Sequence, residues 1–483
     1  MNSQPVSREI TAKGQDYSQW YLDVVLKTEM ADYGPVKGCM IIRPYGYAVW
    51  ENMQADMDRR IKETGHVNAY FPLFIPKSYL EKEKEHVEGF SPECAWVTVG
   101  GGEELEEPLA IRPTSESMIC SMYAKWVKSW RDLPVLINQW ANVVRWEKVT
   151  RPFLRTTEFL WQEGHTLHAT EEEAEEETLR MLQVYRSFSE EVLAMPVVWG
   201  RKSESEKFAG ALRTYAIEAL MGDGRALQAG TSHNLGQHFA TAYGIEFLDR
   251  DQKRARPWST SWGTSTRMIG GLIMTHGDDA GLVLPPRVAP YQVVIVPIPP
   301  RKGDWNEAVL PRAQAVMAEL RAAGIRVHLD LRDTQQPGFK YADWEMRGVP
   351  LRLELGPRDI EKDQCVLVRR DTREKAFVPL AGLAESVRSR LAAIQRDLLD
   401  RARRFVADNT THVGSYDEFK RVMAEKRGFI VTGWCRSAAC EAKIKEETKA
   451  TVRVIPIEGV PSAGACVRCG DASTGEVYFA QAY

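Results

Sequence analysis

Apolar residues recur along the chain with two different periods, which predict two kinds of element. Spacings of three and four residues predict helices, as in GYAVWENMQADMDRRIKETG (46–65) and after RPTSES. In the second helix a stripe is expected in the core; Met118, Met122 and Trp126 recur along it every fourth residue, with Ile119, Tyr123 and Trp130 close beside them. Short runs rich in Val, Ile and Leu predict strands, as in YQVVIVPI and LRLELG. The chain is therefore expected to mix helices and strands.

The prolines between Pro285 and Pro300 mark a change in this pattern. After them strands and helices alternate, with one helix expected from Trp305 to Ala323 and a long one ending near Ala407. The length also favours several domains. We expect an α+β / α/β multidomain protein with three units, at 1–288, 289–405 and 406–483.

Composition and charge narrow the classes of function. The 483 residues carry a formal net charge of −3, and 44% of them are hydrophobic. This balance excludes a wholly basic nucleic-acid binder but allows a local basic surface. The N-terminal stretch has no charged start followed by an apolar core, as a secretory signal would, and no run of about 18 apolar residues predicts a membrane helix. We expect a cytoplasmic location and no membrane partner.

Half of the eight cysteines lie close together near the end of the sequence. Cys435 and Cys440 form a C-x4-C pair, and Cys466 and Cys469 form a C-x2-C pair. In a reducing compartment such a cluster favours a metal over disulfides. Four thiolates leave no open coordination position, so we expect a structural zinc ion.

Charged residues interrupt the apolar run QWANVVRWEKVTRPFLRTTEFLWQEG (139–164). In a strand, Arg145 and Glu147 would project from the same face, which predicts either a buried ion pair or a ligand for each. Arg151 and Arg155 fall in the expected connection between two strands. Three other stretches place polar residues at comparable positions: Thr114 and Glu116 at a helix start, Gln228, Thr231 and His233 in a Gly-flanked turn, and Arg267 at the start of an apolar helix.

In this order the stretches resemble the three motifs of the class II aminoacyl-tRNA synthetases. GPVKGCMIIRPYGYAVWE (34–51) resembles motif 1, VVRWE with the following loop resembles motif 2, and Gly263 to Arg267 with the next helix resembles motif 3. RPTSE, FLWQEGH and GTSHNLG further resemble the prolyl-tRNA synthetases of the archaeal/eukaryotic type, and the resemblance covers nearly the whole chain. It implies an antiparallel-sheet catalytic domain, an α/β anticodon-binding domain and a small zinc-binding C-terminal domain.

The resemblance also implies roles for the polar residues. Arg145 and Arg267 would be catalytic, with Arg145 on the α-phosphate and the substrate carboxylate and Arg267 towards the γ-phosphate. Thr114, Glu116, Arg145 and His233 would bind L-proline, with Phe159 or Trp161 as an apolar wall. The ATP-binding set would be Arg145, Glu147, Thr156, Thr157, Gln228, Thr231, Ser265 and Arg267. Glu345 and Arg352 would read the anticodon of tRNA(Pro).

The implied reaction joins L-proline to tRNA(Pro) through a prolyl-adenylate, with Mg²⁺ on the phosphates of ATP. The resemblance further implies a homodimer formed through motif 1, and no DNA partner. Only 64 residues lie between Gly164 and Ala229, and they are expected to be mostly helical, so we expect no cis-editing insertion. Glu218 is expected on a helix and at the surface.

Two other interpretations remain open at this stage. The chain could be a class IIa relative specific for threonine, serine, glycine or histidine. It could also be a non-catalytic synthetase-like RNA-binding or regulatory protein, although Arg145, Glu147 and Arg267, residues of the kind such proteins lose, are all present.

Overall fold

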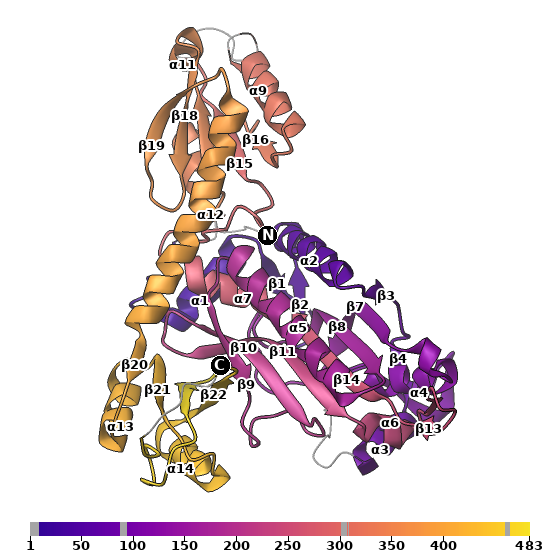
Figure 1. Ribbon diagram of the computed structural model, residues 1–483. Helices are drawn as coiled ribbons and strands as arrows, with labels where there is room; N and C mark the ends of the chain where they lie inside the picture. Colours follow the sequence, from indigo (N-terminus) through magenta and orange to yellow (C-terminus); the bar gives the residue numbers. More distant parts are fainter. Residues whose placement is uncertain (1–8, 87–93, 301–306, 308, 459–463) are drawn as a thin grey trace.

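A sheet of eleven strands runs through the lower part of the molecule in the computed structural model (Figure 1). The structure describes residues 9–86, 94–300, 307, 309–458 and 464–483. In sheet order the strands are β20 (Thr410–His412), β21 (Phe429–Gly433), β23 (Glu476–Gln481), β22 (Ala450–Pro456), β9 (Val197–Arg201), β10 (Arg213–Leu220), β11 (Ala226–Gly236), β14 (Trp258–Ser265), β8 (Glu158–His168), β7 (Val135–Val144) and β3 (Val67–Asn68).

The middle of this sheet, from β9 to β7, is antiparallel throughout. Gly164 of β8 makes room for the ring of Trp262 on β14, because a Cβ at Gly164 would lie 2.1 Å from that ring. Trp262 is almost completely buried and stands edge-on to the rings of His66 and Tyr185. One face of the sheet is thereby closed, and its other face is free for a ligand.

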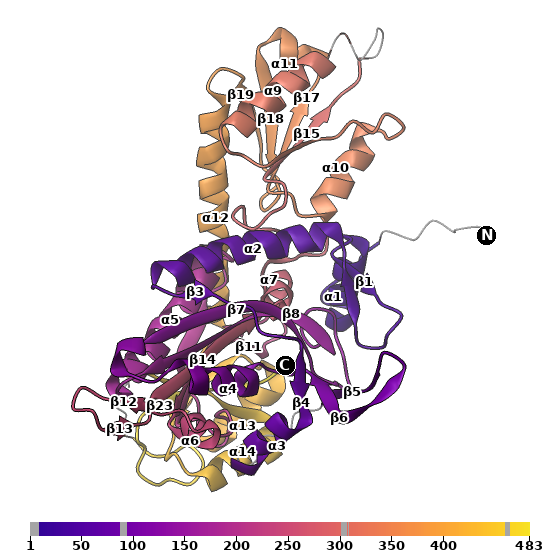
Figure 2. The same ribbon diagram turned by 90° about the vertical axis from the view of Figure 1, so that its right-hand side faces the viewer.

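Helices and small sheets surround the antiparallel region (Figure 2). The helices are α1 (Tyr17–Lys27), α2 (Pro44–Glu63), α3 (Lys77–His86), α4 (Glu116–Trp126), the 3₁₀ helix η1 (Trp130–Asp132), α5 (Glu171–Glu191), α6 (His238–Tyr243) and α7 (Arg267–His276). The small sheets pair β1 (Ala31–Tyr33) with β2 (Met40–Ile42), β12 (Phe247–Leu248) with β13 (Arg254–Ala255), and β6 (Glu103–Ile111) with both β4 (Phe74–Pro76) and β5 (Ala95–Gly100). None of the helices in the described ranges is long and apolar enough to cross a membrane.

A second sheet of five strands forms the upper part of the molecule (Figure 1). Its order is β16 (Val327–Leu329), β15 (Val293–Pro297), β17 (Leu351–Leu355), β18 (Gln364–Arg369) and β19 (Lys375–Pro379), with parallel pairing around β15 and antiparallel pairing from β17 onward. The helices α9 (Leu310–Ala322), α10 (Pro337–Met346) and α11 (Pro357–Glu361) accompany it. The α/β unit expected after the prolines is confirmed, although its predicted helix start at Trp305 lies outside the described residues.

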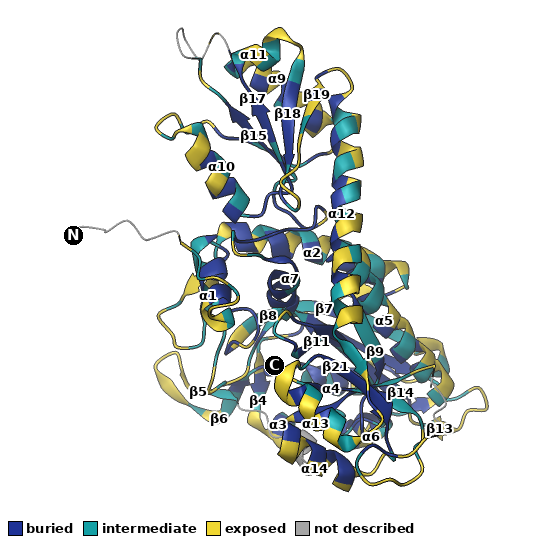
Figure 3. Cartoon of the chain, turned by 90° about the vertical axis from the view of Figure 1, so that its left-hand side faces the viewer, coloured by how far each residue is buried: buried dark blue, intermediate teal, exposed yellow. Residues whose placement is uncertain are grey.

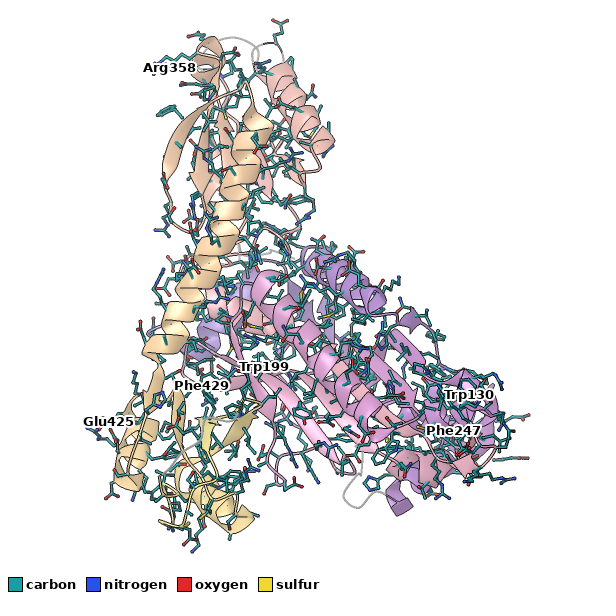
Figure 4. The ribbon with its side chains drawn as sticks, viewed as in Figure 1. Trp130, Trp199, Phe247, Arg358, Glu425 and Phe429 are labelled. Atoms are coloured by element: carbon teal, nitrogen blue, oxygen red, sulfur yellow. The ribbon has the colours of Figure 1, made fainter. Side chains whose placement is uncertain are left out.

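The long helix α12 (Leu383–Asp408) connects this upper part to the C-terminal part (Figure 3). One stripe of α12 is buried along its length, through Val387, Leu391, Ile394 and Leu398, and the opposite face is exposed. The C-terminal part adds α13 (Tyr416–Glu425) and α14 (Ala438–Thr448) to the strands β20 to β23. Because β22 pairs with β9, the C-terminal strands continue the antiparallel region of the eleven-stranded sheet (Figure 4, where Trp199 of β9 and Phe429 of β21 mark the two parts).

Several predicted elements differ in the structure. The segment between Gly164 and Ala229 is not mostly helical, because only α5 is a helix there and the remainder includes β9 and β10. Glu218 lies on β10, completely buried, and is neither helical nor at the surface. On α4 Ile119 and Tyr123 are buried in the core and Met118 and Met122 pack against it, as expected, whereas Trp126 is 50% exposed and lies outside the core.

Candidate active site and metal centre

A cavity of about 280 Å³ opens on the free face of the antiparallel sheet. Its floor comes from β8, β11 and β14, which are neighbours in the sheet. Of the predicted residues, the structure brings the following together in its lining: Thr114, Glu116, Arg145, Phe159, Trp161, Gln228, Thr231, His233, Ser265 and Arg267. Stretches that are far apart in the sequence therefore meet at one site.

Strand geometry explains how these side chains reach the same side. Phe159, Trp161, Glu163 and His165 alternate along β8, and all four line the cavity. On β11 the pairing with β10 skips Ala229, so a β-bulge separates Gln228 from Thr231 and His233. The bulge shifts the alternation by one residue and allows Gln228 to share the face of Thr231. GTSHNLG thus belongs to a strand, not to the Gly-flanked turn that was predicted.

Arg145 lies immediately after the end of β7, not within a strand. Its Nε donates a hydrogen bond to the carbonyl oxygen of Pro113 at 3.0 Å, and its guanidinium carbon is 5.4 Å from the ring centre of Trp161. The surrounding protein desolvates this group and lowers the pKa of Arg145, while its edge stays open to the cavity. The side chain is therefore fixed without an ion pair among the described residues.

Arg267 begins α7 and is held in the same way. Its Nε donates to the carbonyl oxygen of Leu154 at 2.9 Å, and its backbone N–H donates to Oγ of Ser265 at 3.2 Å. Burial, and then the nearby positive charge of Arg145, lower the pKa of Arg267. Two guanidinium groups that lack a paired acid among the described residues thus face one cavity, which favours an anionic ligand.

The opposite charge lies at the start of α4. Thr114 and Glu116 are buried, and Oγ1 of Thr114 donates to Oε2 of Glu116 at 2.5 Å. A buried hydroxyl and carboxylate facing the cavity suit a ligand with an ammonium group.

Histidines complete this end of the cavity. Burial lowers the pKa of His233 to about 3, so its imidazole is neutral, with Nδ1 3.0 Å from Oγ1 of Thr214. His165 behaves in the opposite way: burial alone would lower its pKa, but the hydrogen bond to Glu163 at 3.0 Å raises it. The pKa values of these two histidines are therefore shifted in opposite directions.

The structure does not place Glu147, Thr156 and Thr157 in the lining of the cavity. Glu147 forms an ion pair with Arg155 at 3.1 Å, so the alternative of a buried Arg145–Glu147 pair is wrong. Thr156 and Thr157 are buried, and the carbonyl oxygen of Thr157 accepts a hydrogen bond from the backbone N–H of Arg145. These threonines support the segment that carries Arg145, and their roles toward a nucleotide stay predictions.

Sequence reasoning gave no role to Glu163, His165 or Phe208, which also line the cavity. The alternation of FLWQEGH was a usable signal for Glu163 and His165, because they share the face of Trp161. Phe208 had no such signal, since it lies between strands. Its ring centre is 4.9 Å from that of His233.

A second cavity, of about 200 Å³, lies on the five-stranded sheet and contains both Glu345 and Arg352. Arg352 donates from Nε and Nη2 to Oε1 of Glu354, at 3.0 and 2.9 Å, and stacks over the ring of Tyr341. Glu345 is paired with Arg373 at 2.9 Å. The remaining basic residues of this lining are Arg369, Arg370 and Lys375. Such a basic pocket fits an RNA base and its phosphates.

The four clustered cysteines meet in space as their spacing predicted. The Sγ atoms of Cys435, Cys440, Cys466 and Cys469 all lie within 4.8 Å of one another, and those of Cys435 and Cys469 are 3.7 Å apart. Sulfur atoms bound tetrahedrally to zinc are about 3.8 Å apart, given Zn–S bonds of about 2.3 Å. The cluster therefore fits a four-thiolate metal site.

Comparisons with known proteins agree with this geometry. Residues 96–276 match the model of the tRNA synthetase class II core domain (G, H, P, S and T), residues 292–390 match the anticodon binding domain, and residues 416–483 match the prolyl-tRNA synthetase C-terminal domain. A proline–tRNA ligase of Natranaerobius thermophilus is 60% identical over 100% of this chain and 99% of its own, and proline–tRNA ligase 2 of Clostridioides difficile is 58% identical over 100% and 99%. The crystal structure of a prolyl-tRNA synthetase from Cryptosporidium parvum, complexed with halofuginone and AMPPNP, covers 98% of this chain at 43% identity with a TM-score of 0.94.

The fold is an antiparallel sheet that carries two arginines over a cavity and is joined to an anticodon-binding domain. This combination defines a class II aminoacyl-tRNA synthetase. Within that class, identity of 58–60% along the full length is decisive. The chain belongs to the proline–tRNA ligase family.

Proposed function

We propose that this chain ligates L-proline to tRNA(Pro) in two steps, forming prolyl-adenylate from ATP and then transferring the prolyl group with release of AMP. The observation that supports it best is the pairing of two free guanidinium groups, Arg145 and Arg267, with a buried carboxylate, Glu116, in one cavity. A zwitterionic amino acid and a polyphosphate are complementary to that arrangement.

In the first step, the carboxylate of proline attacks the α-phosphate of ATP and diphosphate leaves. Negative charge concentrates between two anions, so catalysis requires fixed cations and accurate positioning instead of a covalent nucleophile. Arg145 would hold the α-phosphate and the carboxylate, and Arg267 would hold the γ-phosphate end. Because both are anchored through Nε, their terminal nitrogens are free for these oxygens.

The secondary ammonium of proline would bind Oγ1 of Thr114 and the carboxylate of Glu116. The neutral ring of His233 and the rings of Phe159 and Trp161 would contact the pyrrolidine, which is apolar. A charged imidazole at His233 would repel the ammonium, and its lowered pKa prevents this.

For ATP we propose contacts from Gln228, Thr231 and Ser265 inside the cavity, and from Glu147, Thr156 and Thr157 in the segment that follows Arg145. Mg²⁺ neutralises phosphate charge when it is bound with ATP. The four cysteines are the one group of three or more metal-ligating side chains found among the described residues, so the phosphates themselves would carry Mg²⁺. Glu218 is unsuitable as a ligand because Lys202 and Arg453 already neutralise it.

In the second domain, we propose that Glu345 and Arg352 read bases of the anticodon, while the neighbouring Lys and Arg side chains bind the backbone. Zinc at the four cysteines would be structural, since all four positions are occupied by thiolates. As an enzyme of translation, the chain would act in the cytoplasm.

We also propose a homodimer formed through the segment that resembles motif 1. Tyr33 of β1, Ile41 of β2, Tyr47 of α2 and Val36 of the connection between β1 and β2 are all more than 40% exposed. Ile41→Asp is expected to convert a dimer to a monomer in sedimentation velocity, whereas a wild-type monomer would contradict this part of the proposal.

The chain is proposed to lack cis-editing. The stretch 169–225 contains the helix α5 and the strands β9 and β10, and both strands belong to the eleven-stranded sheet. A pocket distinguishes substrates that differ by a methylene only about 10–200-fold. We therefore expect measurable activation of alanine or cysteine, and no exchange with either at saturation would contradict this.

The test of the proposed function is amino-acid-dependent ATP–pyrophosphate exchange with each of the twenty amino acids. Proline is expected to give the highest kcat/KM. Exchange with threonine, serine, glycine or histidine and none with proline would favour another class IIa specificity. Absence of exchange with every amino acid would favour the non-catalytic alternative.

A further inference from the structure

The segment between β9 and β10 contributes three side chains to the active-site cavity: Glu206, Lys207 and Phe208. Phe208 closes the end that contains His233. Its backbone N–H donates to Oγ1 of Thr214 at 3.0 Å, and the same hydroxyl contacts Nδ1 of His233. The position of this segment therefore determines the shape of the cavity where the amino acid would bind.

The start of the segment is fixed by the C-terminal part of the chain. Gly200 of β9 pairs with Pro456 of β22, and a Cβ at Gly200 would lie 2.1 Å from the carbonyl oxygen of Ile455 (Figure 1). Lys202 follows and is buried. Its Nζ donates to Oε1 of Glu218 and to the carbonyl oxygen of Arg453, both at 3.1 Å.

Arg453 completes this buried group of charges. Its Nη2 donates to Oε1 of Glu218 at 2.8 Å and to Oε2 at 3.0 Å. The completely buried carboxylate of Glu218 is thus balanced by one cation from each part of the protein. Removing Glu218 would leave both buried cations without their shared carboxylate, which is strongly unfavourable.

Helix α14 then holds the segment itself. Oγ of Ser203 donates to Oε1 of Glu441 at 2.8 Å, and both residues are only 2% exposed. Three residues further on, Glu206 is 3.3 Å from Nζ of Lys445, one turn along α14 from Glu441. Neither Glu441 nor Lys445 lines the cavity.

We infer that α14 is a positioning element for the amino-acid site: its contacts to Ser203 and Glu206 hold Glu206, Lys207 and Phe208 against the cavity. This inference rests on the proposed function for the identity of the amino acid. A connection without helix or strand loses considerable entropy when it is ordered, and these contacts hold it in place before the substrate arrives. The C-terminal unit thereby acts on amino-acid affinity without touching the substrate.

The experiment measures KM for proline and for ATP in the exchange reaction, with the full chain. Ser203→Ala and Glu441→Ala remove the same hydrogen bond from its two sides. Each is expected to raise KM for proline about 10-fold and to change KM for ATP less than about twofold. The double variant is expected to be no worse than the worse single variant, because one interaction is lost in all three. Glu441→Gln keeps the accepting oxygen and should restore most of the affinity.

Lys445→Ala tests the second contact at an exposed position where folding is not at risk, and it should raise KM for proline about two- to fivefold. Lys443→Ala, on the same helix and exposed, is the matched control and should behave as wild type. Hydrogen exchange of residues 203–208 is expected to become faster in Glu441→Ala while that of α14 stays unchanged.

Unchanged KM for proline in Ser203→Ala and Lys445→Ala would overturn the inference. So would equal increases in KM for proline and ATP, because general loss of structure would explain them. If the wild-type protein uses another amino acid and not proline, the proposed function is wrong. The positioning role of α14 is then tested by comparing KM for that amino acid with KM for ATP in the same variants.

Discussion

Arginine side chains serve the two cavities in different ways. In the catalytic cavity, Arg145 and Arg267 each donate from Nε to a backbone carbonyl oxygen, and neither has an acidic partner in the part of the chain that the structure describes. In the cavity of the second domain, Arg352 is paired with Glu354, Arg370 with Asp278, and Arg369 with Asp371.

The difference shows what each site can do. A backbone carbonyl orients a guanidinium without neutralising it, so the full charge is available for developing negative charge on a substrate. A guanidinium that already has a carboxylate partner can still stack and read a base edge, but its charge is largely compensated. We therefore propose that the free arginines carry the chemistry and that the paired ones carry recognition and structure.

The largest effect is expected for Arg145. Arg145→Ala should reduce proline-dependent ATP–pyrophosphate exchange by at least about 1,000-fold, because a fixed cation is lost where charge develops. Arg145→Lys should retain charge but lose the bidentate fork and recover only part of this activity. Near-normal exchange in Arg145→Ala would contradict the proposal that the arginines without a carboxylate partner carry the chemistry.

A smaller effect is expected for Arg352. Arg352→Ala should raise KM for tRNA in aminoacylation about 10-fold and leave exchange without tRNA unchanged. Lys375→Ala, which removes a cation from the same cavity, is a control for charge alone. Loss of exchange in Arg352→Ala would show that this arginine does more than bind tRNA.

Arg370 tests the structural role of an arginine that has a carboxylate partner. It is buried, and its two terminal nitrogens contact Asp278 at 2.8 and 2.6 Å. Arg370→Ala should lower the free energy of unfolding by roughly 1–2 kcal/mol, because the buried guanidinium and its contacts with the half-exposed carboxylate of Asp278 are lost. Exchange activity at low temperature should be close to wild type. Denaturant titration measures the free energy of unfolding, and initial rates measure the exchange activity. If Arg370→Ala is as stable as wild type, a structural role for Arg370 is contradicted.

Stability at acid pH should depend in part on histidines, because burial lowers the pKa of His168, His233 and His276. Burial lowers the pKa of His276 to about 4, and the unfolded chain takes up the proton near pH 6.5. The free energy of unfolding should thus fall as pH decreases from about 6.5 to 4, by roughly 1–3 kcal/mol for this residue. His276→Gln should flatten the curve in denaturant titrations at pH 7 and 4.5, and an unchanged slope would exclude it as the cause.

The sequence predicted that Arg145 and Arg267 share one site, because their types, order and flanking segments carry local information. It predicted the metal cluster because ligand spacing is also local. It could not predict that Glu218 is buried, since its cationic partners come from Lys202 and from Arg453 in another part of the chain. The pairing of β9 with β22 was equally invisible, because strand partners are set by long-range packing.

The prediction that Arg145 and Glu147 lie within a strand was wrong. The strand ends at Val144, and Glu147 pairs with Arg155 across the following turn, where Arg151 and Arg155 exchange backbone hydrogen bonds. A local ion pair with Arg155 therefore holds Glu147 away from Arg145, which has no acidic partner among the described residues. The pattern of charges along the sequence could not show whether Glu147 pairs with Arg145 or with Arg155.

The most direct test of the account is a crossed measurement on Arg145→Ala and Arg352→Ala, in which proline-dependent exchange and the Kd for tRNA(Pro) are determined on the same preparations. The account predicts that Arg145→Ala loses exchange and keeps its tRNA affinity, whereas Arg352→Ala keeps exchange and binds tRNA more weakly. If both variants lose both properties, or if Arg145→Ala keeps exchange, the division between free and paired arginines is contradicted.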